Sequence, residues 1–249
     1  MHILEAVLLF CLASISNNSA AQLCWDFDIP LSLGVEGQLI YRKGYVTSYN
    51  KATKTPFWVA WHLTAEHADG DARRPGAAFH EDLNVPWPRA TNDDYKGSGW
   101  SRGHMCLAGD KKWDRDAMYE SFLLTNVCPQ NPSLNSGVWN QIEISCRQWA
   151  VKHGDLDIVC GPIYYNQEHD SIGYNKVVVP EAFFKVILCL NGTPKGIGFI
   201  CKNTNGNKKK DVYVNSIQQI ERITKLTFFP HLNPDIASKV KSQADLSRW

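Results

Sequence analysis

The 249-residue sequence lacks three features that would each point to a particular class of protein. Its cysteines show no C-x-x-C spacing, so a zinc-ribbon site has no support. Beyond residue 15, no run approaches the roughly 18 apolar residues that a membrane-spanning helix needs. No repeat, low-complexity tract or linker divides residues 22–249. These absences favour a single globular domain over residues 22–249, with no membrane partner.

An excess of either charge is also missing. The chain has 26 Lys and Arg against 25 Asp and Glu, a formal net charge of +1, which is too small to indicate a polyanionic partner. Residues 182–210 nevertheless contain no acid and six lysines, namely Lys185, Lys195, Lys202, Lys208, Lys209 and Lys210. This pattern predicts either a basic strip that attracts phosphates or a solvated hairpin edge whose lysines block strand pairing.

The first residues have the pattern of a secretory signal peptide, which we place at residues 1–21. The segment is apolar from about Ala6 to Ile15, and Ser19 and Ala21 stand at the −3 and −1 positions of a cleavage site. Glu5 and the lack of Lys or Arg before the apolar run leave a frayed apolar N-terminus as the alternative. A signal peptide predicts a secreted or periplasmic protein. It would remove Cys11 and leave seven cysteines, whose pairing we leave open.

Strand and helix patterns alternate along the rest of the chain. Aromatic and β-branched residues predict strands at 38–50 and 56–66, and further strands are expected at 156–165, 176–190 and 196–202, with a loop-like region at 67–96. Short-range patterns predict helices at 114–121, from Asn135 to a C-cap at Gly154, and after the caps Ser216 and Asn233. This mixture with antiparallel connections predicts an α+β fold.

Residues 97–110, GSGWSRGHMCLAGD, combine an arginine and a histidine in a strand-like stretch. Alternate residues of a strand share a face, so Arg102, His104 and Cys106 are expected to point the same way. Gly103 would let another backbone or a substrate approach closely. A lone histidine is more often a surface or satisfied core residue, and a small metal or redox site at His104 and Cys106 stays open as an alternative.

A second polar group follows about thirty residues later. Asn126 ends a strand-like run, Asn135 opens the expected helix, and Glu143 and Arg147 lie on the same flank of that helix. The spacing alone also fits a helix-capping asparagine followed by an exposed Glu143–Arg147 pair.

Ordered sequence blocks across most of residues 40–232 resemble the DNA/RNA non-specific endonucleases, the ββα-metal nucleases that include mitochondrial endonuclease G. The blocks are GYVTSYN, PFWVAWHLT, ATNDDYKGSGWSRGHM, AMYESFLLTNVCPQNPSLNSGVWNQIE, IVCGPI and VNSIQQIERITKLTFFP. The resemblance implies a ββα-metal nuclease fold with a mainly antiparallel central sheet flanked by helices. It also implies a metal-dependent, sequence-non-specific endonuclease that hydrolyses phosphodiester bonds of DNA and RNA and leaves 5′-phosphate ends.

The resemblance assigns a role to each motif residue. It implies His104 as general base, Asn135 as the Mg²⁺ or Mn²⁺ ligand, Arg102 and Arg147 as phosphate-binding arginines, Glu143 as the acid that orients metal-bound water, and Asn126 as an accompanying active-site amide. The chemistry fits these residue types. An imidazole with a reference pKa near 6.5 can take a proton from the attacking water, which predicts activity that rises through this range of pH. An amide oxygen suits a hard cation that keeps most of its water.

The chain departs from the family pattern at Ser101, where the family usually has the aspartate of D-R-G-H. Ser101 should face away from His104, so we expect an effect on the hairpin or on Arg102 rather than on the base. The departure leaves a catalytically silent nucleic-acid-binding homologue as the main alternative, and a structural secreted domain as a weaker one. A further upstream phosphate-binding arginine has two candidates, Arg73 and Arg74. The oligomeric state stays open, with a homodimer as one alternative.

Overall fold

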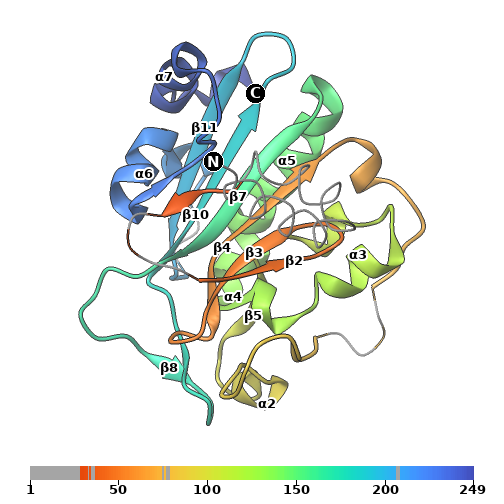
Figure 1. Cartoon of the computed structure of the whole chain (residues 1–249), viewed down its shortest axis with the longest axis vertical. Helices are drawn as coiled ribbons and strands as arrows, with labels where there is room; N and C mark the ends of the chain where they lie inside the picture. The colour runs from red at the N-terminus through yellow and green to blue at the C-terminus, as the bar shows by residue number, and fades with distance from the viewer. Residues whose placement is uncertain (1–28, 33, 35–36, 75, 77–78, 206–207) are drawn as a thin grey trace, which may run out of the picture.

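A computed structural model describes residues 29–249 except 33, 35–36, 75, 77–78 and 206–207 (Figure 1). The predicted signal peptide, residues 1–21, lies outside the described residues.

The centre of the molecule is a seven-stranded sheet in the order β12-β11-β10-β7-β4-β3-β2. Every pair of neighbouring strands is antiparallel. The strands are β2 (Gln38–Tyr41), β3 (Val46–Asn50), β4 (Thr55–Leu63), β7 (Leu156–Ile163), β10 (Ala182–Cys189), β11 (Lys195–Lys202) and β12 (Val214–Asn215). Six of them arise from the five segments predicted as strands, since residues 38–50 form both β2 and β3. Together with the flanking helices they confirm the expected α+β class.

Each face of this sheet is covered by its own helices. Alternation along β10 sends Phe183 and Ile187 into a core shared with α5 (Asn140–His153), and sends Phe184 and Val186 into a core shared with α6 (Ile217–Thr224) and α7 (Pro234–Ser242). Figure 1 shows α6 and α7 together on one side of the strands, away from α3 (Arg115–Glu120). Because both faces of the sheet are covered, β10 is buried along its whole length, and all of its residues except Lys185 are apolar.

The helix boundaries follow local side-chain chemistry. Ser216 Oγ accepts the Gln219 N–H at 3.1 Å at the start of α6, and Asn233 Oδ1 accepts the Asp235 N–H at 2.9 Å at the start of α7. Gly154, with φ +92°, ends α5. These three caps confirm the predicted helix ends.

Smaller elements surround the sheet. Three two-stranded ladders pair β1 (Leu31–Ser32) with β13 (Leu226–Thr227), β5 (Ser101–His104) with β6 (Val127–Gln130), and β8 (Ser171–Ile172) with β9 (Val177–Val178). Short helices are α2 (Asn92–Tyr95), α4 (Pro132–Leu134), the π-helical turn η4 (Asn135–Trp139), and the 3₁₀ turns η1 (Glu66–Ala68), η2 (Ala108–Asp110), η3 (Leu124–Asn126), η5 (Lys210–Tyr213) and η6 (Leu246–Arg248). The region 67–96, expected as loop, thus contains the helix α2.

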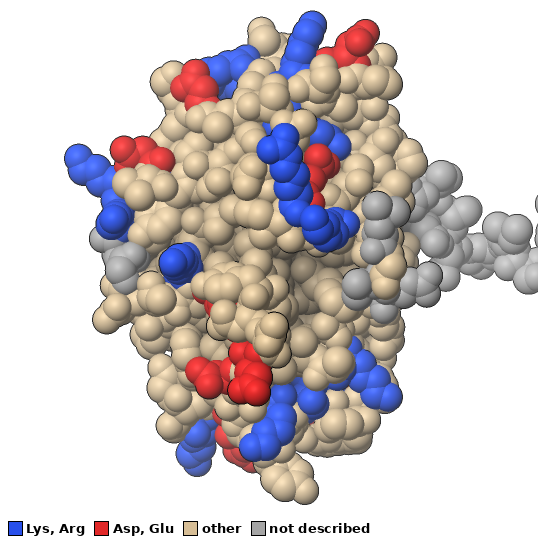
Figure 2. All heavy atoms as spheres, turned by 90° about the vertical axis from the view of Figure 1, so that its left-hand side faces the viewer, with Lys and Arg blue, Asp and Glu red and all other residues tan. Residues whose placement is uncertain are grey.

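The basic strip expected over residues 182–210 is interrupted. Lys185 and Lys195 are only 1% and 6% exposed, because strand alternation turns both into the protein, whereas Lys202, Lys208 and Lys209 are exposed. On the face drawn in Figure 2, Lys and Arg are interspersed with Asp and Glu. No continuous basic track marks that face.

The cysteine side chains of the described chain lie in the protein interior. Six cysteines of the described chain are free and buried, namely Cys106, Cys128, Cys146, Cys160, Cys189 and Cys201.

Among the described residues, no helix has the length and apolar character needed to cross a bilayer.

Candidate active site

The β5–β6 hairpin carries the predicted histidine and arginine. Its register pairs Arg102 with Pro129 and His104 with Val127. Arg102 and His104 both contact the ring of Phe79, with Arg102 Cζ 5.7 Å from its centroid and the His104 ring centroid at 4.9 Å. The two side chains therefore share one face of β5, as the strand pattern predicted.

The room left by Gly103 is taken by a neighbouring side chain. A Cβ on Gly103 would lie within 2.2 Å of Gln130 Oε1 and 2.6 Å of Gln130 Cβ. Close approach was expected here from another backbone or a substrate, but the group that fills the space is the buried Gln130 side chain from β6.

Cys106 does not share the environment of His104. The strand ends at His104, and Cys106 lies in the core that contains Met105 and Cys128, where burial raises the pKa of its thiol to about 12. The predicted alternation therefore does not extend to Cys106. A protonated thiol in that core is also a poor metal ligand and a poor redox group.

His104 is held between two aromatic rings. The centroid of Phe122 lies 5.0 Å from the imidazole at an interplanar angle of 86°, and Phe79 covers another side. Nε2 is buried and forms no hydrogen bond with another described residue. Burial lowers the pKa of His104 to about 3, and the positive charge of Arg74 adds to the effect. The imidazole is therefore neutral at physiological pH, and its activity-linked titration is expected well below the reference value near 6.5.

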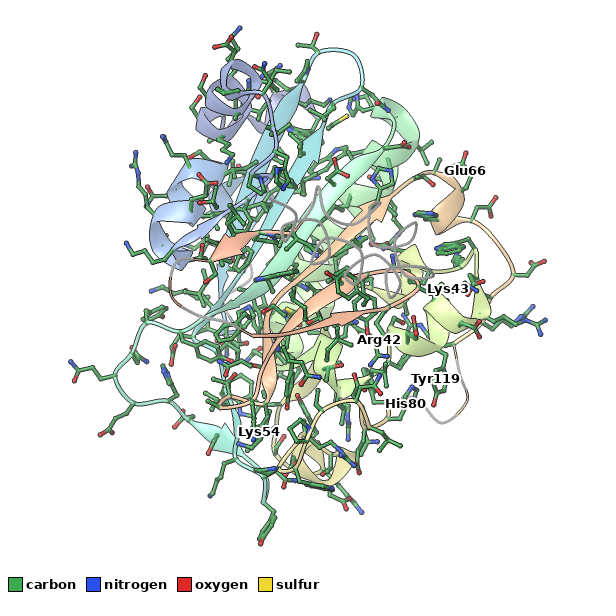
Figure 3. The ribbon with its side chains drawn as sticks, viewed as in Figure 1. Arg42, Lys43, Lys54, Glu66, His80 and Tyr119 are labelled. Atoms are coloured by element: carbon green, nitrogen blue, oxygen red, sulfur yellow. The ribbon has the colours of Figure 1, made fainter. Side chains whose placement is uncertain are left out.

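The aromatic lid on His104 is fixed by its neighbours along the chain. His80 N–H donates to Phe122 O at 3.2 Å, and Leu124 N–H donates to His80 O at 2.9 Å. The His80 ring stacks on Tyr119 with centroids 4.0 Å apart (Figure 3). Phe79 is thereby anchored through the residue that follows it.

Arg102 is oriented by its own contacts. Its Nη2 donates to the Asn92 carbonyl oxygen at 2.8 Å, and its Cζ lies 5.2 Å from the Tyr95 ring centroid. Of the two upstream candidates, Arg74 is the one whose charge acts on His104. Two guanidinium groups therefore lie near the imidazole.

Asn126 is fully buried and its amide is used by the backbone. Its Oδ1 accepts the Cys106 N–H at 2.9 Å, and its Nδ2 donates to Cys106 O at 2.7 Å and to Ser121 O at 2.8 Å. These bonds fix the chain two residues beyond His104. The side chain thus positions the histidine strand, and its predicted role beside the substrate stays a prediction.

The helix that carries Asn135 begins one turn earlier than predicted. Asn131 is the cap, with Oδ1 accepting the Ser133 N–H at 2.9 Å, and Asn135 follows in the π-helical turn where Gly137 has non-helical angles of φ −96° and ψ −118°. The Asn135 backbone N–H donates to Asn131 O at 2.9 Å. Because Asn135 is not the cap, its side-chain carboxamide does not bond to the first turn of the helix. That carboxamide forms no hydrogen bond with another described residue.

The helix and the hairpin contribute to one hydrophobic core. Leu134 and Val138, which flank Asn135, share a core with Met105 and Cys128, and Cys128 is paired with Gly103. The hairpin and this helix therefore form one packed ββα unit.

Glu143 and Arg147 lie in a second polar group beneath the helix. Arg147 Nη1 donates to Asp110 Oδ1 at 3.1 Å, and Trp61 Nε1 donates to Asp110 Oδ2 at 3.1 Å. Glu143 is 7% exposed, and burial raises its pKa to about 8, with Asp110 adding to the rise while Lys185 and Arg147 oppose it. The alternative of an exposed Glu143–Arg147 pair is therefore wrong.

The sequence analysis did not identify Asp110 or Lys185 as members of this group. Lys185 Nζ lies 4.9 Å from the ring centroids of both Trp61 and Trp139. Nothing in the local pattern near Asp110 or Lys185 marks them, because their partners come from other elements. No hydrogen bond or ion pair between described residues joins the group of Glu143 to that of His104.

Comparison with known proteins identifies the fold and the family. The DNA/RNA non-specific endonuclease family matches residues 28–235. The mitochondrial nuclease EXOG of Xenopus laevis is 36% identical over 220 residues, which cover 82% of this chain and 62% of the relative. The mitochondrial endonuclease G of Bos taurus is 33% identical over 209 residues, or 78% of this chain and 70% of the relative.

A solved structure agrees with the sequence relatives. A chain of the crystal structure of the EndoG/EndoGI complex superposes with a TM-score of 0.74 at 28% identity, covering 81% of this chain and 89% of that chain. The chain belongs to the DNA/RNA non-specific endonuclease family. The ββα-metal nuclease fold expected from the sequence is thereby confirmed.

Two further facts concern this endonuclease family member as a whole. The chain spans 62% and 60% of the length of the EXOG nucleases of Xenopus laevis and Homo sapiens. The prediction of a secreted or periplasmic protein is contradicted, since these relatives and the endonuclease G proteins of Bos taurus and Homo sapiens are named as mitochondrial. An apolar N-terminal segment is a weak localisation signal without the basic residues that should precede it.

The side chains of the site fit a hydrated hard cation rather than a zinc ion. Within the described chain, no group of three or more His, Cys, Asp or Glu side chains could hold a metal ion, so the donor set of a zinc site is missing there. Asn135 offers a carboxamide oxygen that no described residue engages. One neutral oxygen ligand suits a cation such as Mg²⁺, which keeps several of its waters.

Proposed function

We propose that this chain is a metal-dependent endonuclease that hydrolyses phosphodiester bonds in DNA and RNA without sequence preference and leaves 5′-phosphate ends. The single observation that carries the proposal is the neutral His104 imidazole, whose Nε2 has no hydrogen-bond partner among the described residues and which lies near Arg102 and Arg74. The family membership supports the same reaction.

His104 would act as the general base. In the tautomer protonated at Nδ1, the buried Nε2 has a lone pair that no described residue engages, so it would accept the proton that a water molecule loses as it attacks phosphorus. A base with a pKa near 3 is weak in the free protein, but the negative charge of a bound phosphate favours the imidazolium and raises that pKa in the complex. Substrate binding would therefore strengthen the base when it is needed.

The arginines would bind the phosphates. Arg102 is oriented by Asn92 and Tyr95, Arg74 is exposed, and Arg147 is oriented by Asp110. A guanidinium can pair with phosphate oxygens in a bidentate manner. Contacts to the sugar-phosphate backbone carry no base information, which accounts for the absence of sequence preference.

Asn135 would hold the metal ion, with Mg²⁺ as the first candidate and Mn²⁺ as the second. When bound, such an ion offsets the charge on the phosphoryl oxygens and on the leaving 3′ oxygen. Glu143, protonated below about pH 8, would donate a hydrogen bond to water near that ion. Asn126 would hold the strand that presents His104.

The test is nicking of supercoiled plasmid and cleavage of RNA with Mg²⁺ or EDTA. We expect cleavage of both by the wild type with Mg²⁺ and none with EDTA. Asn135→Ala should lose most activity, while Asn140→Ala on the same helix should keep it. A wild type that binds plasmid but does not nick it would instead establish the silent homologue.

A further inference from the structure

A cleft beside α2 displays two aromatic side chains that are largely exposed to solvent. Trp87 and Tyr174 both line it, together with Thr91, Asp93 and Asn175. Tyr174 is 95% exposed and Trp87 is 56% exposed. Large aromatic rings left in water at one place mark a binding surface more often than a structural one.

The loop that presents Tyr174 is firmly anchored. The Asn175 N–H donates to Asp94 Oδ1, and Asn175 Nδ2 donates to Asp94 Oδ2, both at 2.9 Å. Gly173 has φ +67° and packs so closely on Asp94 that a Cβ would lie 2.3 Å from the Asp94 Cα. The ring is thus exposed on a backbone that is held in place, which lowers the entropy lost when a ligand binds.

This cleft is joined directly to the site of His104. Asn92 lies between the cleft residues Thr91 and Asp93, and its carbonyl oxygen accepts a hydrogen bond from Arg102 Nη2 at 2.8 Å. Ile172 and Val177, on either side of the Tyr174 loop, share a core with Val127, the cross-strand partner of His104. In Figure 1, α2 and β8 lie together at the lower end of the molecule.

The charges of the cleft favour a flat neutral group over a phosphate. Glu81 Oε2 is paired with Arg89 Nε at 3.0 Å, and Arg89 Cζ lies 4.5 Å from the Trp87 ring centroid. Asp94 is occupied by Asn175 and by Thr91, whose Oγ1 donates at 2.9 Å. Among the described residues, the side chains that line this cleft include carboxylates but no lysine or arginine, so a phosphate would meet repulsion there.

We propose that the cleft is a subsite for one unpaired nucleobase of the strand whose phosphates meet Arg102, which rests on the proposed function. A base inside a duplex has both faces stacked on its neighbours, so it reaches aromatic side chains only when it is single-stranded or turned out. The subsite therefore favours single-stranded over duplex substrates. Asp93 offers an acceptor to bases that carry amino hydrogens.

The experiment compares a labelled single-stranded oligonucleotide with the duplex of the same sequence. Trp87→Ala and Tyr174→Ala are measured against Tyr165→Ala, a matched control whose tyrosine is 58% exposed outside the cleft. We expect each cleft variant to raise KM for the single strand about 10-fold with kcat unchanged, as the loss of one stacking contact requires. Duplex cleavage and the Tyr165→Ala variant should stay at wild-type values. Tyr174→Phe should restore the single-strand KM.

A second arm removes one base at a time from the single strand. For the wild type, KM should rise by the same factor when the missing base is at one particular position. For Tyr174→Ala, the missing base at that position should not change KM. Equal KM values for wild type and cleft variants, or an equal fall on single strand and duplex, would overturn the subsite. If the wild type cleaves neither substrate, the proposed function fails, and fluorescence anisotropy of the same oligonucleotide decides the subsite alone. Equal affinity of wild type and Tyr174→Ala would then overturn it.

Discussion

Burial of His104 predicts that one histidine makes the protein sensitive to acid. The folded protein holds the pKa of His104 at about 3, whereas the unfolded chain should have the reference value near 6.5. Since the folded pKa is lowered, the stabilising contribution is complete above pH 6.5 and is lost as the pH falls towards 3. Between these values the unfolded state binds about one more proton than the folded state. The free energy of unfolding therefore falls by about 1.4 kcal/mol for each unit by which the pH is lowered.

The perturbation is His104→Gln, measured by urea unfolding at pH 6.5 and pH 4.5. Integration over this interval gives a fall of about 2 kcal/mol in the wild-type free energy of unfolding between pH 6.5 and pH 4.5. The variant should not show this fall. The exposed His231 gives the matched control, since His231→Gln should follow the wild type. Parallel pH dependence of wild type and His104→Gln would refute the burial of a neutral imidazole.

Three further predictions concern the surroundings of the site. Arg147→Ala should lower the free energy of unfolding by about 3 kcal/mol, because it leaves the buried Asp110 carboxylate without its cation, and Asp110→Asn in the same chain should recover part of the loss in urea unfolding. Glu143→Gln should gain stability relative to the wild type as pH rises from 5 to 8, since the raised pKa of Glu143 makes the wild type lose stability over that range; identical slopes would count against its burial. Gly103→Ala should cost about 2 kcal/mol through its clash with Gln130, and Gln130→Gly, which removes the Cβ as well as the rest of the side chain, should relieve that cost in a double-mutant cycle.

The sequence predicted those parts of the fold that depend on local pattern. Alternating and apolar runs located the strands of the central sheet, and short capping motifs located the ends of α5, α6 and α7. The cap of the site helix was misplaced because Asn131 and Asn135 both fit the local chemistry, and only the backbone decides between them. Lys185 was expected in a basic strip because charge, unlike its position in the sheet, is visible in the sequence.

The site was predictable only where a motif lies within one element. Arg102 and His104 share a strand, so alternation placed them correctly on one face. The rings of Phe79 and Phe122 that lower the pKa of His104, and the Asp110 partner of Arg147, come from other segments. Such contacts depend on the packing of distant elements, which no short-range pattern encodes.

The role of His104 as general base is tested most directly by the rate of plasmid nicking by His104→Ala at neutral pH with Mg²⁺, beside wild type and His231→Ala. We expect His104→Ala to unfold cooperatively yet to cleave at least about 100-fold more slowly, as loss of a general base requires, while His231→Ala keeps the wild-type rate. Added imidazole should restore part of the lost rate. A folded His104→Ala protein that nicks plasmid as fast as the wild type would contradict the role of His104 as the base.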